Sequence, residues 1–227
     1  MRNYLVVTAM KEEMDALLSY FDGVEDKGDD IFYVKKDGFT LYTMIGGIGK
    51  VSMAYRLGVF LATHKVDTLI NVGVAGSISK RLVPFKTLIA DKVCYHDVDV
   101  RAFGYHIGQM CQMPLYFPCD SQLVSKALFI GKEDAMKGLI LSGDSFITKD
   151  NLNSNVFADF DDPLAMDMES AAVAQVSYMA KIPFLIIRSI SDDTTSDDSN
   201  KEEYERNLKK ASDRAAEIVA RLILEKW

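Results

Sequence analysis

Two acidic residues each end a strand-like apolar run and could carry acid–base chemistry. Glu169 ends the run 164–169, and a helical pattern follows it at once. Asp192 ends the apolar run 184–192. A carboxylate within apolar sequence is costly to ionise unless it is paired, so such positions favour a functional role. Because ligands bind at the carboxyl ends of strands in open α/β sheets, we expect both residues to face one cleft.

Alternating strand and helix patterns must position these residues. Short apolar runs predict strands over 3–9, 31–36, 39–45, 68–74, 87–94 and 137–141, with a hairpin turn between the second and third. Helical spacing of apolar residues predicts helices over 11–21, 50–64 and 201–226. The polar segment 192–200 is expected to be either a mobile lid or an ordinary surface loop. We therefore expect one domain over residues 1–227, built of strands and helices around a mixed sheet.

Composition and charge restrict the kinds of partner. The 227 residues carry a net charge of −7, whereas a nucleic-acid surface would need a basic stripe. No apolar run approaches the ~20 residues of a membrane span, and the N-terminus lacks a signal-peptide layout. Cys94, Cys111 and Cys119 match no metal spacing. These features predict a reduced, cytoplasmic protein that binds neither nucleic acid nor membranes.

Two motifs that invite a cofactor interpretation fail on spacing. The segment 46–50 resembles a phosphate loop, but no Ser or Thr follows Lys50 and Met44 stands where the first glycine belongs. Ser52 likewise replaces the third glycine of a dinucleotide fingerprint. We interpret these glycines as a tight turn into the next helix. The cluster 96–99, with His96 and two aspartates, has no companion, so we expect neither a metal nor a cofactor.

Seven motifs occur in an order that resembles one known family. They are the segments 9–13, 47–51, 71–76, 95–105, 142–147, 166–169 and 188–192. Together they resemble the 5′-methylthioadenosine/S-adenosylhomocysteine nucleosidases, within the purine nucleoside phosphorylase superfamily. The resemblance implies a homodimer and a single-domain three-layer α/β/α sandwich with a mixed central sheet, nucleoside phosphorylase-like. It implies hydrolysis of the adenine–ribose bond of methylthioadenosine, S-adenosylhomocysteine or 5′-deoxyadenosine, and leaves open which nucleoside is preferred.

The resemblance also implies the roles of individual residues. Glu13 corresponds to the carboxylate that activates water, Asp192 to the acid facing adenine N7, and Glu169 to the residue that holds the ribose hydroxyls. The substrate-binding residues that it implies are Ala9, Met10, Ile48, Val74, Gly76, Val100, Phe103, Tyr105, Phe146, Ile147, Met168, Arg188 and Ser191.

Several of these residues match particular parts of the substrate. Phe146 matches the ring stacked on adenine, and Ile147 matches the backbone that reads the edge of the base. Tyr105 falls in the segment that the family donates to the neighbouring subunit. The wall around the 5′-alkylthio group is matched by Met10, Ile48, Val100 and Phe103.

The chemistry needs two carboxyl groups in opposite protonation states. An acid at N7 lets adenine leave as a neutral molecule, while a base across the sugar prepares water. Asp192 follows an apolar strand, where desolvation would raise its pKa. Glu13 lies one turn into a helix, where the helix dipole favours the anion. The two environments are therefore expected to separate the acid from the base.

Some assignments stay open at this point. Arg188 either orients water or a carboxylate, or is a structural partner of Asp167 or Glu169. A phosphorylase is the alternative reaction, although a phosphate dianion beside ionised Glu13 would be repelled by about 4 kcal/mol for each unit charge pair near 4 Å. A nucleoside-binding protein without turnover is the alternative from another class.

Four departures from the family pattern bear on rate and substrate preference. Val74 stands where the family commonly has a serine, and Asp167 is one methylene shorter than the usual glutamate. Cys111 replaces a common proline in the segment that faces the partner. The polar stretch 194–200 does not supply the usual apolar lid residue.

Overall fold

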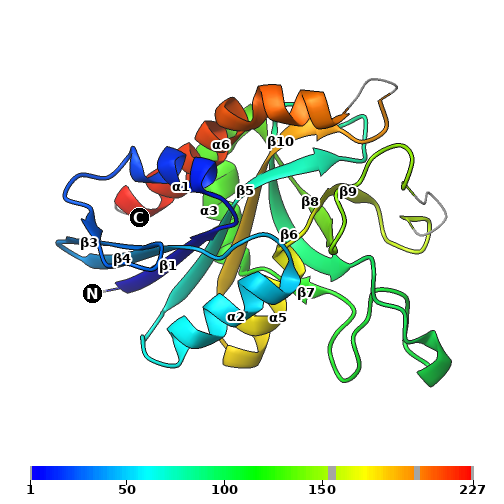
Figure 1. The fold of residues 1–227 in the computed structure, drawn as a ribbon, viewed down its shortest axis with the longest axis horizontal. Helices are drawn as coiled ribbons and strands as arrows, with labels where there is room; N and C mark the ends of the chain where they lie inside the picture. Colours follow the sequence, from blue (N-terminus) through cyan, green and yellow to red (C-terminus); the bar gives the residue numbers. More distant parts are fainter. Residues whose placement is uncertain (1, 153–156, 197–199, 226–227) are drawn as a thin grey trace.

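A mixed sheet forms the centre of the molecule, with helices on both of its faces (Figure 1). The computed structural model describes residues 2–152, 157–196 and 200–225. The strands are β1 (Arg2–Thr8), β2 (Glu25–Asp26), β3 (Ile31–Lys36), β4 (Phe39–Ile45), β5 (Thr68–Ser77), β6 (Thr87–Tyr95), β7 (Phe117–Pro118), β8 (Ala135–Ser142), β9 (Pro163–Asp167) and β10 (Phe184–Asp193). The helices are α1 (Lys11–Leu18), α2 (Lys50–Leu61), α3 (Ser121–Gly131), α5 (Ser170–Ala180) and α6 (Asn200–Leu224).

The order of strand pairing gives a closed ring with an extension. β10, β6, β8, β9 and β5 pair in turn, and β10 also pairs with β5, so these strands close on themselves. β1, β4, β3 and β2 continue outward from β5. Parallel pairs such as β1–β5 and β5–β10 occur beside antiparallel pairs such as β6–β10. The expected mixed central sheet is therefore confirmed, whereas the ring closure has no counterpart in the sequence pattern.

The helices form two outer layers, as the α/β/α class requires. α1, α3 and α6 cover one face of the sheet, and α2 and α5 cover the other (Figure 1). Strand β10 lies between the layers and is buried at every position from Phe184 to Asp192. A strand that is covered on both faces reads as a continuous apolar run, which explains the sequence signal that precedes Asp192.

Most predicted elements are present with small shifts at their ends. The hairpin β3–β4 turns at Asp37 and Gly38, with Gly38 in the left-handed region at φ 91°. Helices α1 and α2 end three residues before the predicted ends of 11–21 and 50–64, at Leu18 and Leu61. The predicted end of the last helix, residue 226, lies outside the described residues.

The prediction that 192–200 is one polar loop is wrong at both ends. Asp192 and Asp193 continue β10, because they pair with Gly76 and Ser77 of β5. Asn200 already belongs to α6, while residues 197–199 lie outside the described part. Thr194 between them is buried and bonds the Ser77 carbonyl through both its N–H (3.0 Å) and its hydroxyl (2.7 Å).

The other composition-based expectations concern cysteines and membranes. Cys94 and Cys119 are buried free thiols, and Cys111 is an exposed one. A cytoplasmic location stays a prediction. Among the residues that the structure describes, no helix has both the length and the apolar character that crossing a bilayer needs.

Candidate active site

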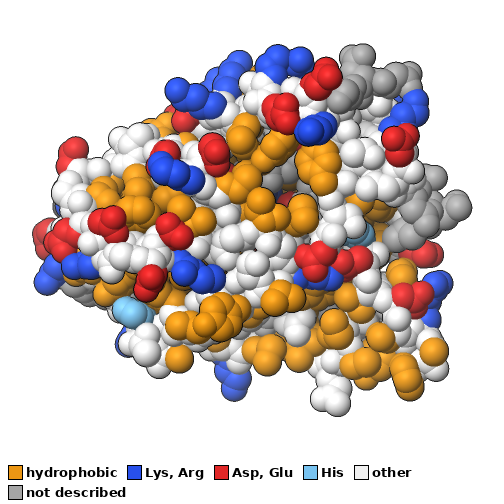
Figure 2. All heavy atoms as spheres, viewed as in Figure 1, with side chains coloured by type: hydrophobic (Ala, Val, Ile, Leu, Met, Phe, Trp, Pro, Cys, Tyr) orange, Lys and Arg blue, Asp and Glu red, His pale blue; other side chains and the backbone are white. Residues whose placement is uncertain are grey.

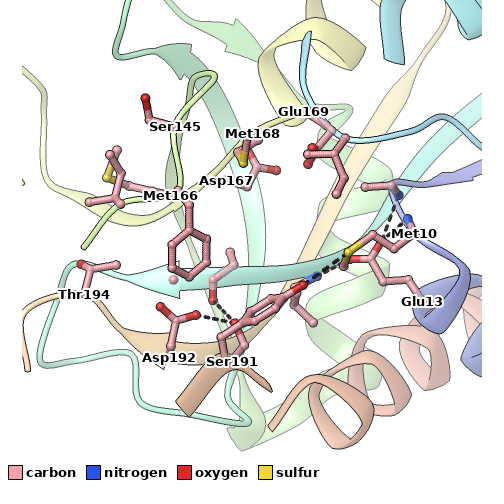
Figure 3. Close-up of a pocket in the computed structure, with 18 residues that line it drawn as sticks. Met10, Glu13, Ser145, Met166, Asp167, Met168, Glu169, Ser191, Asp192 and Thr194 are labelled. Carbon is pink, nitrogen blue, oxygen red and sulfur yellow. Dashed lines mark hydrogen bonds between the residues drawn. The ribbon is translucent and has the colours of Figure 1, made fainter. Parts of the chain in front are cut away.

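A cavity of about 270 Å³ opens where four strands end. The ends of β1, β5, β9 and β10 line it, together with α1, α6 and the loop after β8. Figure 2 shows hydrophobic side chains gathered around a hollow on this face. In the close-up, Glu13 and Asp192 lie on opposite sides of the cavity, with Glu169 on a third side (Figure 3). The expectation that distant acidic residues share one cleft is thus met.

Glu13 is a buried carboxylate that three backbone amides hold. Its side chain is only 4% exposed. Oε2 accepts the N–H groups of Ala9 (2.9 Å) and Met10 (3.2 Å), and Oε1 accepts that of Val74 (3.0 Å). Burial raises the pKa of Glu13, while the buried Arg188 guanidinium and these N–H groups act in the opposite direction. The expectation that the surroundings of Glu13 favour the anion is therefore wrong in its net effect, because desolvation outweighs Arg188 and the N–H donors.

Gly73 makes room for the Glu13 carboxyl group. A Cβ atom at position 73 would collide with Oε1 of Glu13. The collision involves a carboxyl group that three backbone amides already fix, so it cannot swing away freely. Any side chain at 73 is expected to displace Glu13 from the cavity.

A β-bulge turns two consecutive residues of β10 toward the cavity. The register against β5 shifts between Ile190 and Asp192, so Ser191 is the additional residue. Neighbouring side chains of a regular strand point to opposite faces, and a bulge removes that restriction. Ser191 and Asp192 consequently both line the cavity, and the Ser191 hydroxyl donates to Oδ1 of Asp192 at 2.6 Å.

Asp192 has the smallest solvent-exposed fraction of the three acids. It is 1% exposed, and burial raises its pKa as the sequence predicted, against the hydrogen bonds from Ser191 and Asn200. The Asn200 amide nitrogen donates to Oδ2 of Asp192 (3.0 Å) and to the carbonyl of Ile147 (2.8 Å). Two acceptors from distant segments therefore converge on one NH₂ group.

Glu169 lies between the N-termini of two helices. It is the N-cap residue of α5, and its Oε1 accepts the N–H of Gly49, the N-cap residue of α2, at 2.8 Å. Gly49 has φ 87°, which confirms the interpretation of this glycine segment as a turn into a helix. Burial and the neighbouring Asp167 raise the pKa of Glu169 to about 8.

Arg188 is a structural partner of Asp167. Its Nε and Nη2 atoms lie 2.8 Å and 2.7 Å from Oδ2 of Asp167, and Nη2 also donates to Asn71. Asp167 in turn accepts the Ser170 hydroxyl at 2.5 Å, at the start of α5. Arg188 is 2% exposed and does not line the cavity. Of the two open alternatives, the structure supports the structural one.

The loop after β8 supplies an aromatic and an apolar wall. Phe146 and Ile147 line the cavity, and Asn151 fixes this loop by donating to the Phe146 carbonyl at 2.9 Å. The Phe146 ring is 40% exposed and meets the Tyr204 ring edge-on, with ring centres 5.6 Å apart.

The structure brings most of the predicted site residues together. The predicted residues that line the cavity are Ala9, Met10, Glu13, Ile48, Val74, Gly76, Phe146, Ile147, Met168, Glu169, Ser191 and Asp192. Four predicted residues do not line it: Val100, Phe103, Tyr105 and Arg188. Phe103 is 78% exposed on the surface.

Six lining residues were not predicted as site residues. They are Ala75, Ser145, Met166, Asp167, Thr194 and Tyr204. The first four belong to the same motifs as predicted site residues, and that shared membership was a usable signal. Tyr204 lies on α6, beyond the motifs, and only its place on the inner face of a helix could have indicated it.

The cluster at 96–99 contributes to the architecture around the site. Asp97 accepts the Lys50 ammonium at 2.6 Å and the Asp144 N–H at 2.9 Å, so it ties α2 to the loop after β8. Within the described ranges, no group of three His, Cys, Asp or Glu side chains is placed to hold a metal ion.

Comparisons with known proteins show which family this chain resembles. The sequence model of the phosphorylase superfamily matches residues 3–224. The 5′-methylthioadenosine/S-adenosylhomocysteine nucleosidase of Aeromonas salmonicida (strain A449) is 33% identical over 225 residues, which cover 96% of this chain and 97% of that protein. The nucleosidase of the same name from Staphylococcus saprophyticus is 36% identical over 225 residues, with the same coverage. A solved structure from Borrelia burgdorferi B31, described as such a nucleosidase bound to adenine, has a TM-score of 0.91 and 32% identity, covering 97% of this chain and 98% of that one.

Proposed function

Because this chain belongs to the phosphorylase superfamily and, within it, to the 5′-methylthioadenosine/S-adenosylhomocysteine nucleosidases, we propose that Glu13 and Asp192 hydrolyse the adenine–ribose bond of these two nucleosides. The protein is a nucleosidase. The assignment of the catalytic residues and of the individual substrates is the proposal.

The convergence of Asp192 and Ile147 on one NH₂ group is the observation that carries the proposal. Along one edge, adenine presents the acceptor N7 beside the 6-amino donor. A protonated Asp192 can give its proton to N7. The 6-amino group of adenine can donate to Asp192 and to the Ile147 carbonyl, the two acceptors that bind the Asn200 amide in this structure. Burial raises the pKa of Asp192, which favours the protonated carboxyl group that this step needs.

Glu13 and Glu169 serve the ribose side of the cavity. Glu13 accepts a proton from water that attacks C1′, and its three N–H donors keep the carboxylate aimed at that place. Glu169 accepts hydrogen bonds from the ribose hydroxyls. Positive charge develops on the sugar as the bond to N9 breaks, and the ionised form of Glu13 stabilises that charge.

The 5′ substituent lies against the apolar end of the cavity. Met10 and Ile48 form that wall, and a methylthio group or the thioether of S-adenosylhomocysteine fits its character. The wall offers no reason to reject a plain methyl group, so 5′-deoxyadenosine is part of the proposal.

Val100, Phe103 and Tyr105 are proposed to act across a homodimer. In the single chain they lie away from the cavity, while exposed apolar side chains extend over α2 and α5, among them Val51 and Tyr55 (Figure 2). A second copy seated there would cover this surface and bring the segment 100–105 to the neighbouring cavity.

Mixing two inactive variants tests this arrangement. Asp192→Asn removes the acid of its own subunit, and Phe103→Ala removes the wall that its subunit would donate. If the segment completes the partner's cavity, refolding the two variants together restores activity in one site of each mixed dimer. A strictly self-contained site would give no recovery.

The assay that tests the function measures free adenine released from methylthioadenosine with and without phosphate. We expect release that does not depend on phosphate, because no lining residue within the described ranges carries a cationic side chain to hold a phosphate dianion. Asp192→Asn should abolish release while still binding a stable analogue. Phosphate-dependent release would identify a phosphorylase, and binding without release a nucleoside-binding protein.

A further inference from the structure

Tyr204 brings a hydroxyl group to the otherwise apolar end of the cavity. It lies on α6 and is half-buried, and its hydroxyl is 3.3 Å from the sulfur of Met10. Its ring meets Phe146 edge-on at 75°, so the side chain is fixed from two sides. Tyr204 therefore contacts both Phe146, which is predicted to stack on adenine, and Met10, which is predicted to face the 5′ group.

The hydrogen bond from Tyr204 to Met10 is a weak one. A thioether sulfur is a poor acceptor compared with a hydroxyl oxygen. The phenol also stays protonated, because burial and the carboxylates of Glu13 and Glu12 raise its pKa to about 12. The Tyr204 hydroxyl can therefore donate to a stronger acceptor in place of the Met10 sulfur.

A donor and an adjacent weak acceptor together match the needs of one alcohol. A hydroxyl placed between the two side chains can accept the phenol proton and give its own proton to the Met10 sulfur. Without Tyr204, a hydroxyl against Met10 and Ile48 would lose its hydrogen bonds to water and find only the sulfur.

We propose that this nucleosidase also hydrolyses adenine nucleosides with a free 5′-hydroxyl group, which Tyr204 and Met10 bind as a pair. The inference rests on the proposed function, since it uses the same placement of the sugar. The reaction is unchanged: the oxygen of water bonds to C1′ as the C1′–N9 bond breaks. Glu13 takes the proton of the water, and Asp192 gives a proton to N7 of the departing adenine.

The test compares adenosine with 5′-deoxyadenosine, which has no acceptor at the 5′ position. For each protein, the quantity is the ratio of kcat/KM for adenosine to kcat/KM for 5′-deoxyadenosine, measured as adenine release. Any effect of a variant on steps common to both nucleosides cancels in this ratio. Tyr204→Phe keeps the ring against Phe146 and should lower the ratio about five- to fiftyfold, as expected when a buried hydroxyl loses its partner. Tyr20→Phe, at an exposed position that follows α1 and lies outside the cavity lining, is the matched control.

Met10→Leu is the second variant, because it removes the acceptor and leaves the donor. We expect it to lower the same ratio by a smaller factor, since the sulfur is the weaker partner. Thermal unfolding of each variant shows whether the fold is kept, and calorimetric binding of adenosine supplies a readout that does not need turnover.

The outcomes separate this inference from the proposed function. Adenine release from methylthioadenosine but not from adenosine would overturn the inference and leave the function in place. An unchanged ratio in Tyr204→Phe would overturn it as well. Absence of release from every nucleoside would instead overturn the proposed function.

Discussion

The amide nitrogen of Asn200 lies 3.0 Å from Oδ2 of Asp192 and, with its other hydrogen, donates to the carbonyl of Ile147 at 2.8 Å. The first residue of α6 thus joins the end of β10 to the loop after β8. Both acceptors are aimed at a single NH₂ group, which is a selective arrangement. An oxygen in the same place would face two acceptors and no donor.

This arrangement predicts discrimination between 6-aminopurines and 6-oxopurines. We expect kcat/KM for 5′-methylthioinosine to be lower than that for 5′-methylthioadenosine by at least about a hundredfold, because a site built on hydrogen bonds leaves its polar groups unpaired with the wrong base. Steady-state assays on the two nucleosides check this. Comparable rates would mean that Asp192 and Ile147 do not read the 6-position.

Glu13 and Glu12 form a natural pair of test positions, one buried and one exposed. Glu13→Gln should lower kcat by about 10²–10⁴, the range typical of a lost general base. The amide would also turn an N–H donor toward one of the three backbone N–H groups, which costs about 1–3 kcal/mol of stability. Kinetics together with denaturant unfolding measure both effects.

Glu12→Gln is the control, because it changes the same charge on the same turn. It should leave kcat within about twofold and stability within about 0.5 kcal/mol, as is usual for an exposed position. If Glu12→Gln lost as much activity as Glu13→Gln, the base would be assigned to the wrong neighbour.

Much of the fold could be predicted because apolar runs and helical spacing mark the buried elements. Helix α3 was nevertheless missed, although Asp120 caps it by accepting the N–H groups of Gln122 and Leu123 at 3.0 Å. That capping residue was the available signal. The ring closure of β10 onto β5 could not be predicted, because strand order depends on contacts between distant segments.

The acids of the site could be predicted and the surroundings that set their protonation could not. Glu13 lies in a helix whose dipole favours the anion, yet burial raises its pKa. Sequence does not show that Val74 and Gly73 of β5 enclose this carboxyl group. The bulge at Ser191 is equally invisible, since it follows from the register against β5.

The buried pair of Arg188 and Asp167 should matter for stability. Arg188→Met leaves the Asp167 carboxylate buried without its partner, and we expect the free energy of unfolding to fall by roughly 3–5 kcal/mol. Lys11→Met, which removes the exposed pair with Asp15, should cost less than about 1 kcal/mol. Urea unfolding measures both. A large loss of kcat in Arg188→Met with unchanged stability would favour a role in orienting water instead.

The pKa of Glu169 predicts how stability depends on pH. Its ordinary value is 4.5, and in the folded protein burial and Asp167 raise it to about 8. Between these values the unfolded chain has released the proton and the folded chain still holds it. The free energy of unfolding should therefore fall as pH rises through this window, by an amount on the order of a few kcal/mol.

Glu169→Gln removes this titration and keeps an oxygen that can accept the Gly49 N–H. The variant should consequently lose less stability than the parent protein between pH 5 and pH 8.5, and it should be the more stable of the two at the higher pH. Denaturant unfolding at both pH values checks this, with exposed Glu12→Gln as the control for a change in net charge. Parallel losses in the parent protein and in Glu169→Gln would show that Glu169 is already ionised in the folded state at pH 5, held by the N-termini of α2 and α5.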